Sequence, residues 1–366
     1  MYDYLVVGAG LVGSIFAFEA KKRGKKCLVI EKRNHFGGNL YCESRNQINI
    51  HKYGPHIFFT NNKKIWNYIN NFCEFEQYVH RTKVNYKNKI YSFPINLLTL
   101  NQLWGVKTPE EAIIKLNEVK IKIQDPSNLK EFILSKAGWD IFSIFYEGYS
   151  KKQWGLDCEN IPITIGQRIP IRLSFDDNYH DAIYTGMPID GNYNPIFENL
   201  LNGIEVKLNT EFDKKSWSKI AKKLVYCGAI DEFFDYKYGV LNYRSLRFEE
   251  KELQLENFQG CSQMNYTEEK IPHTRIIEHK WFTKNKNTSN TIISYEYPEK
   301  WEIGKERYYP IENEQNKNLY KKYLECFDKI ENVIGGGRMF NYKYMNMDAA
   351  IGNGLKLVQE EFHEKI

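Results

Sequence analysis

The sequence lacks the marks of a secreted or membrane-spanning protein. It has no run of about 18 apolar residues, the length that a membrane helix requires. Its N-terminus leads directly into a short apolar segment, without a basic region or a cleavage site of small residues. Its seven cysteines form an odd set with no C-x-x-C pair. We therefore expect a cytoplasmic protein in a reducing compartment, with no membrane span.

Patterns typical of nucleic-acid binding, metal binding or triad catalysis are also missing. The formal net charge is only +5, and Lys and Arg are interleaved with Asp and Glu throughout the chain. Without a basic stripe, the sequence does not predict binding to nucleic acid. No residues have the spacing of a metal site, and no Ser-His-Asp series or Cys-His pair stands out. We expect a small anion as the partner and no metal.

Hydrophobic and aromatic residues, in contrast, are abundant. They make up 42% and 15% of the chain, which is typical of a folded protein with a sizeable interior. A length of 366 residues favours two or three structural units that share one continuous chain. No internal repeat or low-complexity tract is present, so a repeat architecture is excluded.

The first 31 residues predict a β-α-β unit. Residues 2–8 form an apolar run that ends in glycine, and residues 11–23 have a periodic apolar face and stop at Gly24. Residues 26–31 then form a second buried strand. Loops this short are typical of parallel α/β units. The fold therefore opens as α/β.

Three glycines at the first strand-to-helix turn predict a dinucleotide site. Gly8, Gly10 and Gly13 form a G-x-G-x-x-G motif, which permits a tight turn, close approach to a pyrophosphate and close packing of helix on strand. The positive end of the helix then faces the phosphates. Glu31 ends the second strand, where a carboxylate accepts the ribose hydroxyls of an adenosine.

The residues after Glu31 favour FAD over NAD. Arg33 and then Gly37-Gly38 follow the acidic residue directly, a pattern that resembles FAD proteins in which the chain returns along the pyrophosphate. The alternative interpretation of Arg33 is a solvated surface charge.

Apolar periodicity predicts the remaining elements less sharply. The predicted elements are a hairpin over 81–93 around Lys87-Asn88, helices within 99–150, a long functional loop over 157–194, strands at 224–227 and 332–334, several antiparallel strands over 243–296, and a helix over 347–361.

Several longer strings point to one family. They are Y-G-P-H-I-F-F-T (53–60), F-Y-E-G-Y-S-K-K-Q-W-G (145–155), R-I-P-I-R-L-S-F-D-D-N-Y (168–179), Y-R-S-L-R-F (243–248), N-Y-T (265–267), T-R-I-I-E-H-K (274–280) and G-G-R (336–338). Together they resemble bacterial UDP-galactopyranose mutase, in order and over essentially the whole chain.

The resemblance implies a fold, a reaction and a homodimer. The implied fold is α/β, with a Rossmann-like FAD-binding domain, a helical insert and a twisted antiparallel β-sheet substrate domain. The implied reaction interconverts the pyranose and furanose forms of UDP-galactose, with N5 of the reduced flavin as nucleophile and NAD(P)H or another reductant as electron source. The product, galactofuranose, belongs to cell-surface polysaccharide biosynthesis. The implied boundaries are 1–80, 195–240 and 315–366 for FAD binding, 98–160 for the insert, and 81–97, 161–194 and 241–314 for the substrate domain.

The resemblance also assigns site residues. Arginines suit a departing diphosphate because a planar guanidinium grips phosphate oxygens at two points and stays charged. The implied catalytic residues are Arg168, Arg275, Arg338 and His56. The implied cofactor-binding residues are Gly8, Gly10, Gly13, Glu31, Arg33, Gly38, Asn39, Gly337 and Met347. The implied substrate-binding residues are Phe145, Tyr146, Tyr149, Ser150, Trp154, Arg168, Tyr179, Asn265, Arg275, Tyr309, Arg338, Tyr344 and Asn346. For each, the alternative is a structural role in the core or in an exposed ion pair.

The chain departs from the family pattern at a few positions. Phe59 stands where a second histidine is usual, Asn346 where an aspartate is usual, and His180 where an aromatic residue is commoner; Met187 lies in the segment after the loop. These changes are either neutral or shift the substrate towards UDP-N-acetylgalactosamine or a deoxyhexose nucleotide.

Two other functions share parts of the pattern. A flavin oxidoreductase of the amine-oxidase kind has the same G-x-G-x-x-G and Arg-x-x-x-Gly-Gly beginning, and would show net redox turnover. A nucleotide-sugar-binding protein without activity would keep the phosphate-binding residues and act as a scaffold or sensor.

Overall fold

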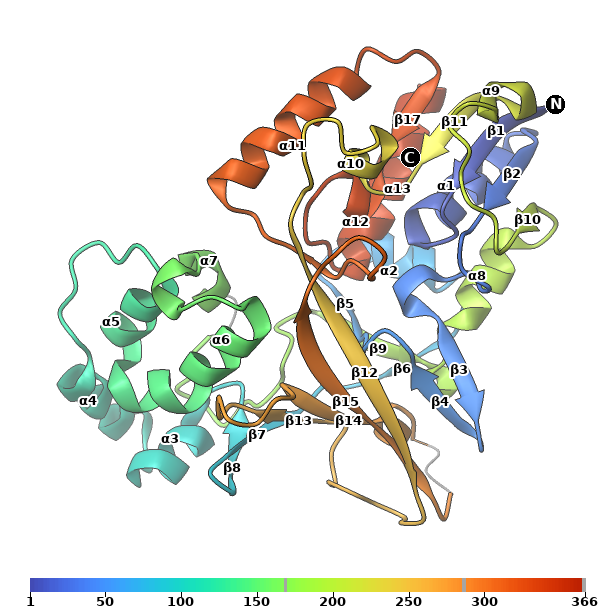
Figure 1. Ribbon diagram of the computed structural model, residues 1–366. Helices are drawn as coiled ribbons and strands as arrows, with labels where there is room; N and C mark the ends of the chain where they lie inside the picture. Colours follow the sequence, from blue (N-terminus) through green and yellow to red (C-terminus); the bar gives the residue numbers. More distant parts are fainter. Residues whose placement is uncertain (168–169, 285–287, 364–366) are drawn as a thin grey trace.

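The computed structural model describes residues 1–167, 170–284 and 288–363 (Figure 1). Its first layer is a five-stranded parallel sheet in the order β10-β2-β1-β11-β17. The strands are β1 (Tyr2–Val7), β2 (Cys27–Ile30), β10 (Glu205–Lys207), β11 (Ala221–Tyr226) and β17 (Val333–Gly335). The sheet therefore draws on three distant parts of the chain.

Alternating side chains of these strands fill two separate cores. Leu5, Leu28 and Leu224 pack with Tyr323 of α11 (Glu314–Phe327) and with α10 (Ile230–Phe233). On the opposite face, Val6 packs against α1 (Leu11–Lys22) and α13 (Met347–Phe362). Helices α8 (Asn194–Leu201), α9 (Trp217–Ile220) and α12 (Gly337–Phe340) complete this part. A parallel sheet buried on both faces is the arrangement that its continuous apolar strands predict.

A cluster of helices forms a separate lobe, drawn in teal and green in Figure 1. Asparagine and threonine caps start its helices: Asn96, Thr108 and Asn128 each accept backbone N–H groups of the first turn. The helices are α3 (Leu97–Trp104), α4 (Pro109–Val119), α5 (Leu129–Ile141), α6 (Gly148–Trp154) and α7 (Ile163–Gly166), with a π-helical turn over Phe142–Glu147 between α5 and α6.

Gly148 explains how the lobe meets the neighbouring sheet. A Cβ at this position would lie 2.4 Å from the carbonyl oxygen of Thr267. Only glycine therefore permits α6 to approach the chain that follows β13. This close contact sets the position of Tyr149, the next residue.

A seven-stranded sheet lies between the two lobes, in the order β16-β12-β15-β14-β13-β7-β8. Its strands are β7 (Thr82–Tyr86), β8 (Lys89–Phe93), β12 (Tyr243–Leu253), β13 (Gln263–Tyr266), β14 (Arg275–Glu278), β15 (Thr291–Lys300) and β16 (Tyr309–Pro310). The hairpin between β7 and β8 turns at Lys87 and Asn88, both at positive φ, as predicted. One expectation needs correction: β13 pairs with β7 in parallel, so the sheet is mixed and not wholly antiparallel.

The predicted loop over 157–194 contains more regular structure than expected. It includes α7 and β9 (Tyr184–Pro188), and β9 joins β5 (Phe58–Thr60) and β6 (Phe75–Gln77) in a three-stranded sheet. The prediction missed these elements because each is short and bounded by Pro or Gly. Helix α2 (Lys63–Ile69) and a hairpin of β3 (Cys42–Arg45) and β4 (Ile48–His51) complete the described structure. No helix in its described ranges is long and apolar enough to cross a membrane.

Candidate functional site

One large cavity, of about 570 Å³, joins the parallel sheet to the mixed sheet. Its wall begins at the glycine turn after β1, continues past the loop at His56, and ends at Tyr149, Arg275 and Tyr309. Segments from all three parts of the fold therefore share one cavity.

Glycines from three segments form the end of the cavity nearest the parallel sheet. Gly8, Gly38 and Gly337 have φ values of +103°, +57° and +87°, a region that disfavours side chains. A Cβ on Gly38 would lie 3.3 Å from Cα of Gly10, and a Cβ on Gly13 would lie 2.1 Å from the carbonyl oxygen of Gly8. Side chains here would occupy the space that a pyrophosphate needs at the start of α1. The cradle therefore fits a dinucleotide.

Glu31 and Arg33 are fixed at the rim of this cradle. The Glu31 carboxylate accepts the backbone N–H groups of Ala9 (2.9 Å) and Arg33 (3.0 Å), which leaves lone pairs for ribose hydroxyls. The Arg33 guanidinium donates to Glu306 (2.5 Å) and to Asn39 (3.0 Å), and it stacks 4.2 Å from the ring centre of Tyr53. With 15% of its side chain exposed, Arg33 is not a solvated surface charge, so that alternative is wrong.

His56 lies in the cavity wall as a neutral imidazole. Its Nδ1–H donates to the carbonyl of Gly54 (2.8 Å), and its backbone N–H donates to Nδ1 of His51 (3.3 Å). Burial, with the neighbouring His51 and Arg338, lowers the pKa of His56 to about 3. The side chain is therefore suited to shaping the wall and to accepting a hydrogen bond, and not to acting as a cation at neutral pH.

Arg275 is a positive charge that the cavity wall holds beside a buried carboxylate. It stands opposite Glu296 in the β14–β15 register, and its Nε lies 2.9 Å from Oε1 of Glu296, whose side chain is 1% exposed. The Tyr149 side chain also hydrogen-bonds to Arg275. Burial opposes the charge, but Glu296 together with Tyr149, Tyr309 and Tyr179 outweighs it, and the pKa of Arg275 stays well above its usual value. A permanent, oriented guanidinium is suited to binding phosphate oxygens.

Aromatic side chains line the cavity next to Arg275. The rings of Tyr309 and Tyr344 stack with centroids 6.0 Å apart, and Trp154 lies 6.3 Å from Tyr309. Burial raises the pKa of Tyr149 to about 12, so its hydroxyl stays protonated and can donate to a ligand. Such a wall combines apolar area with hydroxyl donors.

The structure brings most predicted site residues together. All the predicted cofactor residues line the cavity: Gly8, Gly10, Gly13, Glu31, Arg33, Gly38, Asn39, Gly337 and Met347. So do His56, Tyr149, Trp154, Tyr179, Arg275, Tyr309, Arg338, Tyr344 and Asn346. Arg168 lies outside the described residues.

Four predicted substrate-binding residues do not line the cavity. Phe145, Tyr146, Ser150 and Asn265 are each at most 5% exposed. Phe145 packs against Tyr91 and Phe93, behind the cavity wall. Contact between these residues and a ligand stays a prediction that would require the wall to move.

Two departures from the family pattern, Phe59 and His180, lie against each other. Their rings stack with centroids 3.9 Å apart and planes 14° apart. His180 therefore places an imidazole beside position 59. Met187, in contrast, is fully buried against Tyr193 and does not reach the cavity.

Sequence reasoning missed His80, Gln263 and Glu296, which also line the cavity. His80 precedes a strand, while Gln263 and Glu296 lie inside strands; none belongs to a recognisable motif. For Gln263 and Glu296, the one signal available in the sequence was a polar residue inside an apolar predicted strand, which indicates a buried polar side chain.

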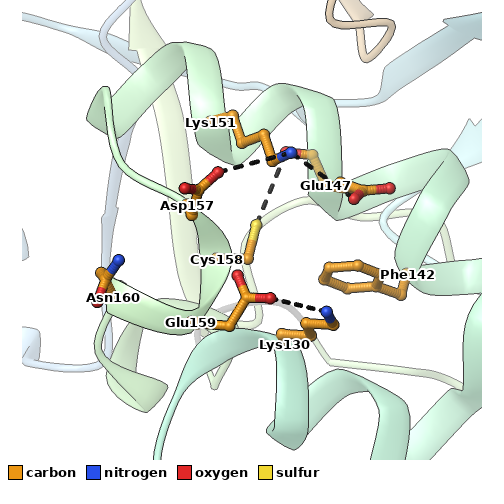
Figure 2. Close-up of a pocket in the computed structure, with 8 residues that line it drawn as sticks. All are labelled: Lys130, Phe142, Glu147, Lys151, Asp157, Cys158, Glu159 and Asn160. Atoms are coloured by element: carbon orange, nitrogen blue, oxygen red, sulfur yellow. Dashed lines mark hydrogen bonds and ion pairs between the residues drawn. The ribbon is translucent and has the colours of Figure 1, made fainter.

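A second hollow, of about 430 Å³, lies in the helical lobe (Figure 2). Its charges are paired: Lys130 lies 2.7 Å from Glu159, and Lys151 lies 3.6 Å from Asp157. Burial raises the pKa of the Cys158 thiol to about 12, so this thiol is not reactive. The hollow offers no group for catalysis, and within the described ranges no three His, Cys, Asp or Glu side chains could hold a metal.

Comparison with known proteins places these features in a family context. Residues 144–344 match the family model for UDP-galactopyranose mutase, and residues 6–72 match that for an NAD(P)-binding Rossmann-like domain. The chain is 35% identical over 370 residues to the dTDP-fucopyranose mutase of Escherichia coli, covering 98% of each chain. It is 34% identical over 364 residues to a probable UDP-galactopyranose mutase of Klebsiella pneumoniae, covering 98% of this chain and 94% of that protein.

Similarity to solved structures concerns the fold alone. The structure of a reduced UDP-galactopyranose mutase superposes with a TM-score of 0.72 at 14% identity, covering 99% of this chain and 96% of the other. A putative protoporphyrinogen oxidase from Exiguobacterium superposes with a TM-score of 0.67 at 8% identity, covering 100% and 99%.

Proposed function

Because this chain belongs to the UDP-galactopyranose mutase family, we propose that it is an FAD-dependent mutase. It would interconvert the pyranose and furanose forms of a UDP-hexose, with UDP-galactose as the first candidate. The observation that carries the proposal is one cavity that holds both a glycine cradle for a dinucleotide and a fixed arginine. A reduced flavin bound there would supply a nucleophilic nitrogen for attack at the anomeric carbon.

The residues of the chain would bind, orient and retain the substrate. Arg275 would neutralise the diphosphate as the glycosidic bond breaks, with Glu296 and Tyr149 holding its guanidinium in place. Arg338, from the start of α12, would approach from the flavin side of the cavity. Retention of UDP matters because the same diphosphate must bond again to the rearranged sugar.

His56 would contribute position and shape. As a neutral ring fixed by Gly54 and His51, it would keep the loop after β4 against the flavin without adding a further positive charge to the site.

A dTDP-linked deoxyhexose is the second candidate substrate. It is favoured by the 35% identity to a dTDP-fucopyranose mutase and by Phe59, a phenyl group in the cavity wall at a position where the family usually has a histidine. An apolar surface tolerates a methyl group where a hydroxymethyl group would lose its hydrogen bonds to water. UDP-N-acetylgalactosamine is a third option within the same reaction.

We also propose a homodimer in the cytoplasm, reduction by NAD(P)H or another reductant, and a role in supplying furanose sugars for cell-surface polysaccharide. These proposals rest on the family resemblance.

The experiment that tests the function is incubation of the dithionite-reduced protein with UDP-galactofuranose or dTDP-fucopyranose, followed by separation of isomers and mass measurement. The proposal expects a new isomer of unchanged mass from at least one of them. A product altered by two hydrogens would favour the amine-oxidase kind of oxidoreductase, and binding without conversion would favour a scaffold or sensor.

A further inference from the structure

Lys152 links the helical lobe to the mixed sheet through three hydrogen bonds. Its Nζ donates to the carbonyl oxygens of Tyr266 (2.8 Å), Ile271 (2.9 Å) and His273 (3.0 Å). An ammonium group has three N–H donors, so each of them has one acceptor. The acceptors lie at the end of β13 and in the loop that leads to β14, whereas Lys152 lies in α6. One side chain therefore connects two parts of the fold that are distant in the chain.

The loop that accepts these bonds leads directly to Arg275. Tyr266 comes just after, and His273 just before, the last residue pair of the β13–β14 register, and that pair includes Arg275. Between His273 and Arg275, the backbone N–H of Thr274 donates to the carbonyl of Glu296 (2.9 Å), whose carboxylate lies 2.9 Å from the Arg275 guanidinium. A shift of this loop would therefore move Arg275 relative to the rest of the cavity wall.

The helix that carries Lys152 also carries part of the cavity wall. Tyr149 precedes Lys152 by three residues and Trp154 follows it by two, and both line the cavity. Arg244 of β12 fixes the end of the same helix, because its Nη2 donates to the carbonyl of Lys152 (3.1 Å) and its Nε to that of Gln153 (2.8 Å). The contact between α6 and the sheet is therefore made in both directions, with Lys152 as donor through its side chain and as acceptor through its backbone.

The three bonds depend on the proton of the amine. Burial lowers the pKa of Lys152 to about 8, although Glu268 and Glu269 oppose that shift. A neutral amine has two N–H donors and a lone pair, so it cannot serve three carbonyls. The link is therefore complete at neutral pH and loses a hydrogen bond as the pH rises above 8.

We propose that Lys152 is a positioning residue for the nucleoside diphosphate, and that its three hydrogen bonds set how far Tyr149 on α6 lies from Arg275 on β14. Lys152 does not line the cavity, so it acts through these two side chains and not by touching the ligand. The inference rests on the proposed function because it requires a nucleoside diphosphate between α6 and β14.

Two variants at Lys152 and one matched control separate positioning from general stability. Lys152→Met keeps the length of the side chain and removes its donors, whereas Lys152→Arg keeps the charge but spreads its donors over a planar fork that cannot converge on three carbonyls. Lys280→Met is the control. Lys280 also donates to three carbonyls, those of Glu256 (2.6 Å), Thr288 (2.9 Å) and Asn290 (3.4 Å), but it lies beyond the other end of β14 and does not line the cavity.

The first measurement is Kd for UDP and dTDP in the oxidised, FAD-loaded protein at pH 7, so that binding is independent of turnover. We expect K152M to bind both nucleotides about 10-fold more weakly than wild type, because a small displacement of a binding group has a large effect on affinity. K152R should lose less, and K280M should stay within about twofold of wild type. All variants should keep bound FAD, since the glycine cradle lies at the parallel sheet.

The second measurement is Kd for UDP between about pH 7 and 9. The ionisable groups around the amine are Glu268, Glu269, His273 and Arg244, and each keeps one charge state in this range. In wild type and K280M, Kd should rise by up to about tenfold as Lys152 loses its proton. In K152M, where UDP itself titrates in the same way, this rise should be absent.

A constant affinity of the wild type for UDP across this pH range would overturn the inference, and this comparison needs no variant to fold. Equal weakening of UDP binding in K152M and K280M would also overturn it, since that points to a general loss of stability. So would an unchanged affinity in K152M. If the wild type bound neither UDP nor dTDP, the proposed function would fall and the inference with it.

Discussion

Replacing Glu296 by Gln should destabilise the folded protein, because Arg275 then lies in the cavity wall without its carboxylate partner. The substitution keeps the size of the side chain but removes the carboxylate 2.9 Å from the guanidinium. The Glu296 side chain is 1% exposed and that of Arg275 is 17% exposed, so water compensates the remaining charge poorly. Breaking a buried pair from one side costs roughly 3 kcal/mol, which lowers Tm by about 4 °C in a chain of this size.

A diphosphate should recover part of that loss. In the variant, UDP supplies the negative charge that Arg275 lacks, so UDP stabilises the variant by roughly 1.5 kcal/mol more than it stabilises the wild type, or about 2 °C in Tm. Differential scanning fluorimetry of the FAD-loaded protein, with and without saturating UDP, measures both quantities.

Glu278→Gln is the matched control for this prediction. Glu278 is fully buried at the end of β14, the strand of Arg275, and accepts hydrogen bonds from Phe258, Gln259 and Thr291, away from the cavity. It should also lower Tm, but without any additional stabilisation by UDP. The same UDP-induced rise in E296Q, E278Q and wild type would refute the assignment of Arg275 as the diphosphate ligand.

Three further predictions follow from the same site. Activity should depend on the flavin's redox state, so the oxidised yellow protein should be nearly inactive until dithionite or NAD(P)H is added; equal turnover of both forms would remove the nucleophile mechanism. The paired change F59H/H180F, which exchanges the stacked rings, should leave kcat/KM for UDP-galactose and dTDP-fucose within about threefold of wild type, whereas F59H alone should change it more. An equal effect of F59H and of the double variant would show that the exchange at position 180 does not compensate for that at position 59. Stability should fall as pH drops from 6.5 to 4, because burial lowers the pKa of His51 and His180 to about 4 and of His80 to about 3, so the unfolded chain binds protons that the folded chain does not. Chemical denaturation at several pH values in this range measures the free energy of unfolding. Its slope against pH should be smaller in H80Q than in wild type by about 1.4 kcal/mol per pH unit, and an unchanged slope would contradict a buried, neutral His80.

Local sequence rules predicted the elements whose residues are neighbours in the chain. The β-α-β opening follows from the apolar strands around Gly8, Gly10 and Gly13, and the hairpin at Lys87-Asn88 follows from its turn residues. The α/β fold is confirmed by the structure and by the family comparisons. The boundaries of the three domains stay a prediction.

Features that depend on distant pairing had no local signature. The parallel contact of β7 with β13 joins segments about half the chain apart, and β9 was hidden inside a stretch that its Pro and Gly residues marked as a loop. Such strands are stabilised by their partners and not by their own periodicity.

The same limit applies to the site. Motif residues such as Arg275 and Tyr149 were found because the family pattern carries them, whereas Glu296 owes its role to what packs beside it. From the sequence, Phe59 and His180 were two separate departures from the family pattern, and only the structure shows that their rings stack on each other. The roles of all these residues stay predictions until they are measured.

The most direct test of the central claim follows the fate of the glycosidic oxygen. UDP-galactose labelled with ¹⁸O between the anomeric carbon and phosphorus is incubated with the reduced protein, and ³¹P NMR follows the label. If the bond to the diphosphate breaks and forms again while Arg275 retains the UDP, the label must move into the non-bridging phosphate positions at least as fast as furanose appears, and Arg275→Ala must slow both. Furanose formation with the label still in the bridging position would contradict the account.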